Sequence, residues 1–89
     1  MKFSLGQIVA TPGALAALEA SGEEPGPYLQ RHVSGDWGDL SEADRKENEL
    51  SLREGFRILS SYKLKSGVVI WCITEADKSS TALLLPDEY

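Results

Sequence analysis

The stretch RHVSGDWGD, residues 31 to 39, holds the side chains of this sequence best suited to chemistry, because it groups the only histidine with a tryptophan and two aspartates. His32 is the one side chain whose ordinary pKa suits general acid and base work near neutral pH. Asp36 and Asp39 form a candidate carboxylate pair, although aspartates also shape turns. Trp37 lies beside two glycines and fits either a binding residue or a plug between a helix and a sheet. The stretch is therefore either a site or a structural clamp.

The acidic and histidine side chains complete no metal or cofactor signature. The available ligands are one histidine and three aspartates, and their spacing matches neither a zinc site nor a calcium loop. They are His32, Asp36, Asp39 and Asp44. The glycine-rich patterns GxGxxG and GxxxxGK[ST], which bind nucleotide phosphates, do not occur. We therefore expect no metal and no other cofactor.

A second group of polar residues surrounds the predicted turn that ends near Thr81. If the helix predicted over residues 42 to 54 packs back over the sheet, His32 comes close to Arg57 and Thr81. Metal-free ribonucleases use these residue types, with histidine moving the 2′-hydroxyl proton and arginine stabilising the phosphorane. One hypothesis is thus a toxin-like ribonuclease with His32, Arg57 and Thr81 as catalytic candidates and Ser79 as an alternative to Thr81. It requires His32 to lie within one side chain or one water of Arg57 or Thr81.

Length and composition indicate one globular domain over residues 1 to 89. The chain is 42% hydrophobic and 26% charged, which is typical of folded proteins. Its net charge of -5 argues against a broad grip on nucleic acid phosphates. No apolar stretch is long enough to span a membrane or to form a signal peptide. Cys72 is the only cysteine, lies in an apolar run and has no disulfide partner within the chain, so we expect a cytoplasmic protein.

The N-terminal half predicts one short strand and two or three helices. Residues 7 to 10 are the candidate strand, and Thr11 is a candidate N-cap for the helix that follows. Residues 23 to 27 are rich in proline and glycine and predict a turn. Ser41 opens a capping-box-like sequence, and Gly55 is a natural helix end. The predicted helices cover residues 13 to 20, 28 to 33 and 42 to 54.

From Phe56 onward the apolar period changes to two, which predicts a three-stranded antiparallel meander. The strands are FRILSSYKL, VVIWCITEA and TALLLP, separated by the turns KSG and DKSS. A turn with Gly67 in the left-handed conformation pairs Leu64 with Val68. The pairs that result are Leu59 with Ile73, Ser61 with Trp71, and Arg57 with Glu75. The whole sequence predicts an α+β fold in which the N-terminal elements pack on this meander.

Both faces of the predicted sheet are apolar, whereas antiparallel sheets usually leave one face to water. One face is expected to carry Phe56, Ile58, Tyr62, Leu64, Val68, Ile70, Cys72, Leu83 and Leu85, and the other Leu59, Val69, Trp71, Ile73, Ala82 and Leu84. Either the helices and the N-terminal segment wrap both faces, or a protein covers one of them. The leading hypothesis is a non-enzymatic accessory that binds a protein partner or forms a homodimer. Its expected binding residues are Asp36, Trp37, Arg57, Trp71 and Glu75. A third hypothesis, an acidic DNA mimic, requires Asp36, Asp39 and the acidic residues of the 42 to 54 helix to form one negative stripe.

The segments IVATPGALAALE, RHVSGDWGDL, GFRILSSY and ITEADKSSTALLLPDEY together resemble a family of small bacterial proteins of plasmids and other mobile elements, labelled plasmid-related protein. The resemblance covers nearly the whole chain. Some members are labelled as type I restriction enzyme methylation subunits, but this chain has neither the cofactor-binding domain nor the Asn/Asp-Pro-Pro-aromatic motif of an adenine methyltransferase. An arginine tends to stand in the family where this chain has Lys78, which keeps the charge but loses a bidentate phosphate contact. The resemblance implies a plasmid-maintenance or defence setting and no particular activity.

Overall fold

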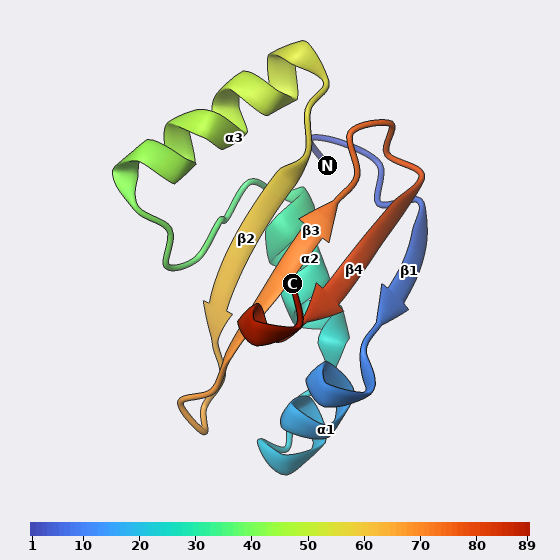
Figure 1. Cartoon of the computed structure of the whole chain (residues 1–89), viewed down its shortest axis with the longest axis vertical. Helices are drawn as coiled ribbons and strands as arrows, with labels where there is room; N and C mark the ends of the chain where they lie inside the picture. The colour runs from blue at the N-terminus through green and yellow to red at the C-terminus, as the bar shows by residue number, and fades with distance from the viewer.

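A four-stranded mixed sheet forms the centre of the molecule (Figure 1), a computed structural model that describes all 89 residues. The strands are β1 (Gln7–Ala10), β2 (Ile58–Lys63), β3 (Val69–Thr74) and β4 (Ser80–Leu84), in the order β1-β4-β3-β2. The helices are α1 (Pro12–Ala20), α2 (Pro25–Val33) and α3 (Glu42–Glu54), and a short 3-10 helix, η1 (Pro86–Glu88), follows β4. The predicted α+β class is confirmed.

The first and third helices begin at the residues that the sequence indicates. The Thr11 hydroxyl accepts a hydrogen bond from the Ala14 amide at 3.0 Å and caps α1. The Ser41 hydroxyl accepts from the Asp44 amide at 3.1 Å and caps α3. Gly55 ends α3 with a φ of 79°, a left-handed conformation that costs glycine little.

The second helix is longer than predicted, and the turn expected over residues 23 to 27 is wrong in its second half. α2 already begins at Pro25 and includes Pro27. The first four amides of a helix have no partner inside the helix, so prolines in the first turn remove no hydrogen bond. Pro25 and Pro27 therefore form part of the first turn of α2, where the sequence predicted a loop turn.

The sheet is four-stranded and mixed, which corrects the prediction of a three-stranded antiparallel sheet. β1 joins the outer side of β4 in parallel, with Ile8 paired to Thr81. The amino-acid pattern of a four-residue strand does not encode its partner, and a parallel pair needs a long connection, which the intervening helices and strands supply. Between β2 and β3 the register is as predicted, pairing Leu59 with Ile73 and Ser61 with Trp71.

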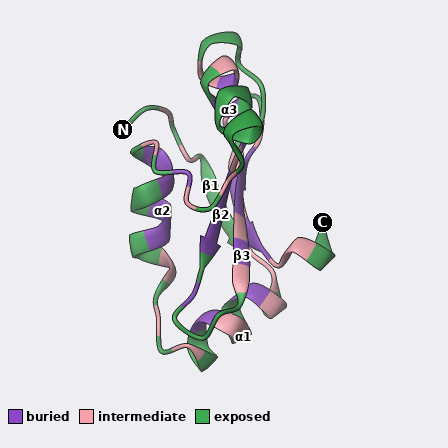
Figure 2. Ribbon diagram, turned by 90° about the vertical axis from the view of Figure 1, so that its left-hand side faces the viewer, coloured by how far each residue is buried: buried purple, intermediate pink, exposed green.

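One face of the sheet carries the hydrophobic core under α1 and α2 (Figure 2). The core cluster consists of Ala14, Leu18, Tyr28, Leu29, Tyr62, Leu64, Ile70, Cys72 and Leu83. Phe56 and Val68 were expected on this face but are exposed. They lie just outside β2 and β3, where strand pairing no longer holds their side chains under the helices.

The opposite face has no long helix over it, and we call it the open face. Its residues are Val9, Leu59, Val69, Trp71, Ile73, Glu75, Ala82 and Leu84, with the polar Gln7, Ser61, Lys63 and Ser80 between them. In Figure 2 α2 lies over the other face, η1 and the end of the chain lie on this side, and α3 and α1 lie at the upper and lower ends of the sheet. Ile73 and Leu84 are buried, whereas Leu59, Val69, Trp71 and Ala82 keep part of their surface exposed. The helices and N-terminal segment thus cover one face and leave much of the other accessible.

Candidate functional site

His32 lies at the centre of a buried network of hydroxyl groups, which we call the hydroxyl network. α2 directs His32 toward the sheet, where its Nδ1 lies 2.5 Å from the Ser60 hydroxyl and its Nε2 lies 2.9 Å from the Thr74 hydroxyl. The Thr74 hydroxyl lies 2.7 Å from that of Thr81. Ser60, Thr74 and Thr81 belong to three neighbouring strands and point to the same face. All four side chains are fully buried.

One backbone carbonyl sets the direction of the hydrogen bonds that lead from Thr81 back to Nε2 of His32. The Thr81 hydroxyl donates to the Leu5 carbonyl at 2.7 Å, and a carbonyl can only accept. Thr81 must then accept from the Thr74 hydroxyl, and Thr74 must accept from Nε2–H of His32. In a neutral ring Nδ1 then carries no proton and accepts from Ser60, and burial keeps this ring neutral. His32 is therefore the neutral Nε2–H tautomer.

Burial keeps this imidazole neutral. Desolvation lowers the pKa of His32 to about 4 from its ordinary 6.5. No carboxylate belongs to the network, so nothing nearby would stabilise an imidazolium. No buried side-chain nitrogen or oxygen in the structure lacks a hydrogen-bond partner. Every polar atom of the network has its hydrogen-bond partner within the protein, so the network is part of the folded core and offers no free group to a substrate.

Two aromatic rings close the network from the side of the N-terminal segment. Phe3 meets the His32 ring edge to face with centroids 5.1 Å apart, and it stacks on Trp37 at 6.3 Å. Trp37 is only 3% exposed, and its indole N–H donates to Glu49 of α3 at 3.3 Å. Trp37 therefore anchors α3 and the 34 to 41 segment and does not form part of an exposed binding surface.

The rest of the 31 to 39 stretch fastens α2 to β2. Arg31 donates to the Asp36 carboxylate at 2.7 Å and lies over the Tyr62 ring, 4.5 Å from its centroid. This bond lowers the pKa of Asp36. The Tyr62 hydroxyl donates to the Asp36 carbonyl at 2.7 Å. Gly38 has a φ of 72° and passes so close to β2 that an added Cβ would lie 2.0 Å from the Ser61 carbonyl oxygen. Asp36 is thus a structural residue as well as an exposed one.

Arg57, Trp71 and Glu75 come together on the open face. Arg57 and Glu75 approach to 3.8 Å and are each about half exposed, which fits the predicted pairing of the two residues. Trp71 meets the Tyr89 ring with centroids 5.8 Å apart, and the Arg57 guanidinium lies over that ring and donates to its hydroxyl. Three of the five predicted binding residues therefore adjoin one another on the open face, where Arg57 and Glu75 are about half exposed and Trp71 is half-buried.

A groove of about 250 Å³ between α3 and β2 borders the open face. Phe56 and Leu59 supply its apolar lining, Arg57 lies at the junction with the open face, and Asp44 and Glu47 of α3 supply acidic groups. A side chain from another molecule could insert here between apolar and charged walls. The sequence did not indicate this groove, because it arises from the angle between α3 and β2.

The structure brings His32 close to only one of its two predicted catalytic partners. Thr74 alone separates His32 from Thr81, which meets the distance requirement of the ribonuclease hypothesis. Arg57 and Glu75 adjoin Ile58 and Thr74 in sequence and therefore point to the opposite face of the sheet. Water and substrate have no access to the fully buried imidazole, and the arginine lies on the other side of a packed sheet.

Sequence reasoning missed the two residues that contact His32 directly, Ser60 and Thr74. Their signal was present, since both occupy positions of the covered face, where the strand pattern otherwise places apolar side chains. Polar residues buried at such positions must find hydrogen-bond partners. The only buried imidazole in the chain could have been matched to them.

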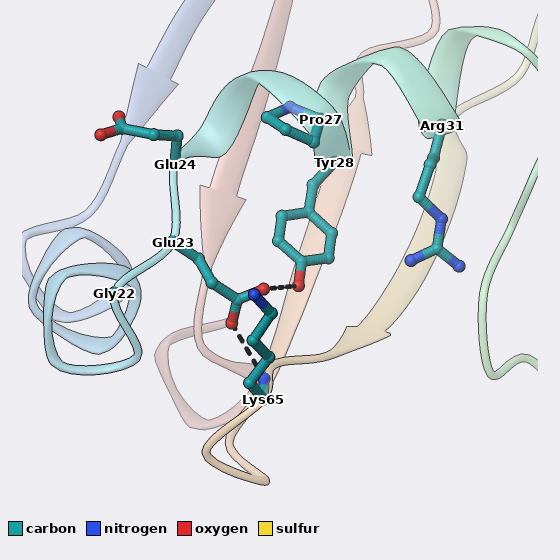
Figure 3. Close-up of a pocket in the computed structure, with 7 residues that line it drawn as sticks. All are labelled: Gly22, Glu23, Glu24, Pro27, Tyr28, Arg31 and Lys65. Atoms are coloured by element: carbon teal, nitrogen blue, oxygen red, sulfur yellow. Dashed lines mark hydrogen bonds between the residues drawn. The ribbon is translucent and has the colours of Figure 1, made fainter.

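A second pocket, of about 420 Å³, lies between the start of α2 and the β2 to β3 turn (Figure 3). The Glu23 carboxylate accepts from the Ser21 hydroxyl at 2.6 Å, from the Lys65 amide at 2.9 Å and from the Tyr28 hydroxyl. These bonds, with that of Ser21 the largest cause, lower the pKa of Glu23 to about 2. The Glu23 carboxylate already occupies the place in this pocket where an anionic ligand would bind. We therefore interpret its hydrogen bonds as structural contacts that join the helices to the β2 to β3 turn.

No three His, Cys, Asp or Glu side chains gather as a metal site would require. None of the helices has both the length and the apolar composition needed to cross a bilayer. Comparison with known proteins finds no matching family model, no similar curated protein and no similar solved structure. Function must therefore be argued from the geometry of the site.

Proposed function

We propose that this protein is a small cytoplasmic accessory protein that works by binding a protein partner through its open face. The observation that carries the proposal is an aromatic and aliphatic sheet face that no long helix covers, next to the groove of Phe56 and Leu59. Leu59, Val69, Trp71 and Ala82 keep part of their surface accessible on this face, and apolar side chains grouped in this way are common in protein interfaces.

The chemistry of the open face defines the partner. Trp71 supplies the large aromatic group that typically anchors a protein interface, and Leu59 and Val69 supply aliphatic surface around it. The Arg57 and Glu75 pair lies at the edge, where charges set orientation more than affinity. A partner would present one or two apolar side chains to Trp71 and the groove, with opposite charges arranged around them.

The resemblance to plasmid-related proteins supports a defence or plasmid-maintenance setting for this interaction. The two other hypotheses have less support. A ribonuclease would need the buried His32 to reach RNA. A DNA mimic would need a continuous acidic stripe, but α3 alternates its acidic residues with Arg45, Lys46 and Arg53, and Asp36 already pairs with Arg31.

Site-specific photo-crosslinking tests the proposal. A photoreactive amino acid replaces Val69 on the open face or, as a matched control, Lys46 on the exposed side of α3. We expect a discrete crosslinked protein from position 69 in host cells and none from position 46. Trp71→Ser should abolish the adduct without lowering thermal stability by more than a few degrees. Equal crosslinking at both positions, or none at position 69, would refute the proposal.

A further inference from the structure

The two edges of the sheet differ in whether their outward backbone groups have hydrogen-bond partners. On the β2 edge, the side-chain NH₂ group of Asn48 donates to the Leu59 carbonyl at 2.6 Å. The side-chain oxygen of Asn48 accepts from the backbone N–H of Leu59 at 3.1 Å. The Ser61 amide donates to the Trp37 carbonyl at 3.1 Å, and the Ser61 carbonyl accepts from the Asp39 amide at 2.7 Å. One side chain and one loop thus occupy the outward backbone groups that another strand would use.

The β1 edge has no such protection. The amides of Gln7 and Thr11 donate to β4, to the carbonyls of Ser79 and Leu83, both at 3.0 Å. Backbone groups alternate in direction along a strand, so those of Ile8 and Ala10 point away from β4. No other element lies beyond β1 in Figure 1, and no side chain caps these groups.

Within β1 the outward residues are apolar and uncharged, and the nearest charged group in contact with the strand's end is Glu88, which accepts from the Thr11 hydroxyl at 2.6 Å. Ile8 is 50% exposed and Val9 is 44% exposed. No charged residue occurs between Lys2 and Glu19. Exposed strand edges are normally kept short or protected by charges, prolines or a covering element, because they template pairing with another chain. At four residues β1 is short, but it has none of the other protections. Such an edge indicates a strand that pairs in the functional assembly.

We propose that β1 pairs with β1 of a second copy of this chain, in antiparallel orientation about a two-fold axis at Val9. Ile8 of each copy then lies opposite Ala10 of the other, and each such pair exchanges both of its N–H to carbonyl hydrogen bonds. The large Ile8 faces the small Ala10, and the two Val9 side chains meet on the axis. The strand is therefore complementary to itself, as a two-fold interface requires.

Charge and topology favour a second copy over an unrelated strand. Two molecules of net charge -5 repel each other, and the uncharged segment around β1 is where they can meet with least repulsion. The capped β2 edges prevent further addition of strands, so the assembly stops at two copies. A two-fold axis perpendicular to the sheet also leaves the two open faces on the same side. The dimer does not depend on the proposed function, because it uses a different surface.

Sedimentation equilibrium and light scattering over a range of concentrations test the dimer. The wild-type protein should reach twice its monomer mass of 9.7 kDa. Ile8→Pro removes one outward amide while leaving the bonds to β4, and it should raise the dimer Kd by about tenfold or more. Ile8→Thr is the matched control, since it keeps the amide and a β-branched side chain and should raise Kd less. Trp71→Ser should leave the dimer intact while abolishing partner capture.

Hydrogen exchange of the wild-type protein gives a second measurement that needs no variant. The amides of Ile8 and Ala10 should become protected as the concentration rises, whereas the exposed amide of Gly26 should not change. A strict monomer at millimolar concentration, unprotected Ile8 and Ala10 amides, or a folded Ile8→Pro protein with unchanged Kd would overturn the inference.

Discussion

Lowering the pH from 7.5 to 5 should destabilise this protein chiefly through His32. The folded chain holds the imidazole neutral with a pKa of about 4, whereas an unfolded chain protonates it near the ordinary 6.5. Between these values the unfolded state binds more protons than the folded state. The free energy of unfolding must therefore fall as the pH falls through this window, and it should be independent of His32 above about pH 7.5.

The shift in pKa sets the size of the effect. One pKa unit corresponds to about 1.4 kcal/mol, so the full difference amounts to about 3 kcal/mol once the pH is well below both values. By pH 5 the linkage relation gives a loss of about 2 kcal/mol. This is a large part of the stability of a small domain, which is typically about 5 kcal/mol.

Other titrating groups leave this window clear. The lowered carboxyl pKa values, those of Glu23, Asp36, Asp77 and Glu88, remove most of their stability below about pH 4.5, where their unfolded forms are half protonated or more. His32 is the only histidine. A slope between pH 7.5 and 5 can therefore be assigned to it.

Urea unfolding followed by tryptophan fluorescence measures this slope. With a typical urea dependence of about 1 kcal/mol per molar, the midpoint should fall by about 2 M between pH 7.5 and 5. The control is His32→Gln, whose amide can donate and accept but does not titrate. It should be less stable at pH 7.5 and show almost no slope. If the wild-type midpoint does not change, or the variant shows the same slope, the argument for a neutral buried imidazole is refuted.

Three further predictions concern other parts of the fold. Gly38→Ala should lower the free energy of unfolding by about 3 kcal/mol because of its positive φ and its contact with β2, whereas Gly26→Ala, which meets open space in α2, should be neutral or stabilising in the same chemical denaturation. Asn48→Ala should cost about 2 kcal/mol and, by opening the β2 edge at Leu59, should produce higher oligomers in light scattering; an unchanged melting temperature would contradict this. Cys72 is buried, which raises its pKa to about 12, so it should react with a thiol reagent only in denaturant, and rapid labelling of the native protein would show that the core is more open than described.

Local signals in the sequence were sufficient for most of the secondary structure. Ser41 and Gly55 delimit α3 through a cap and a left-handed terminus, which depend only on neighbouring residues. The alternation from Phe56 onward, together with the Gly67 turn, sets the register of β2 and β3. The start of α2 was misplaced because two prolines fit a first helical turn as well as they fit a loop.

The candidate site was harder to predict than the elements that carry it. The presence of His32 and Trp37 in one stretch was informative, because their rings do lie together in the structure, with centroids 6.1 Å apart. The sequence could not tell whether they face water. That depends on Phe3, from the other end of the N-terminal half, which packs against both rings.

The sequence by itself determined the α+β class, the helix caps, the hairpin register and the abundance of apolar residues on both faces of the sheet. Each of these follows from propensities and periodicities that act over a few residues. Only the tertiary structure decided that β1 joins β4 in parallel and leaves an open edge, that His32 is enclosed by three hydroxyl groups, and that Arg57 lies on the opposite face. These outcomes depend on which distant segments pack together, and that choice is made by burial and hydrogen-bond satisfaction over the whole chain.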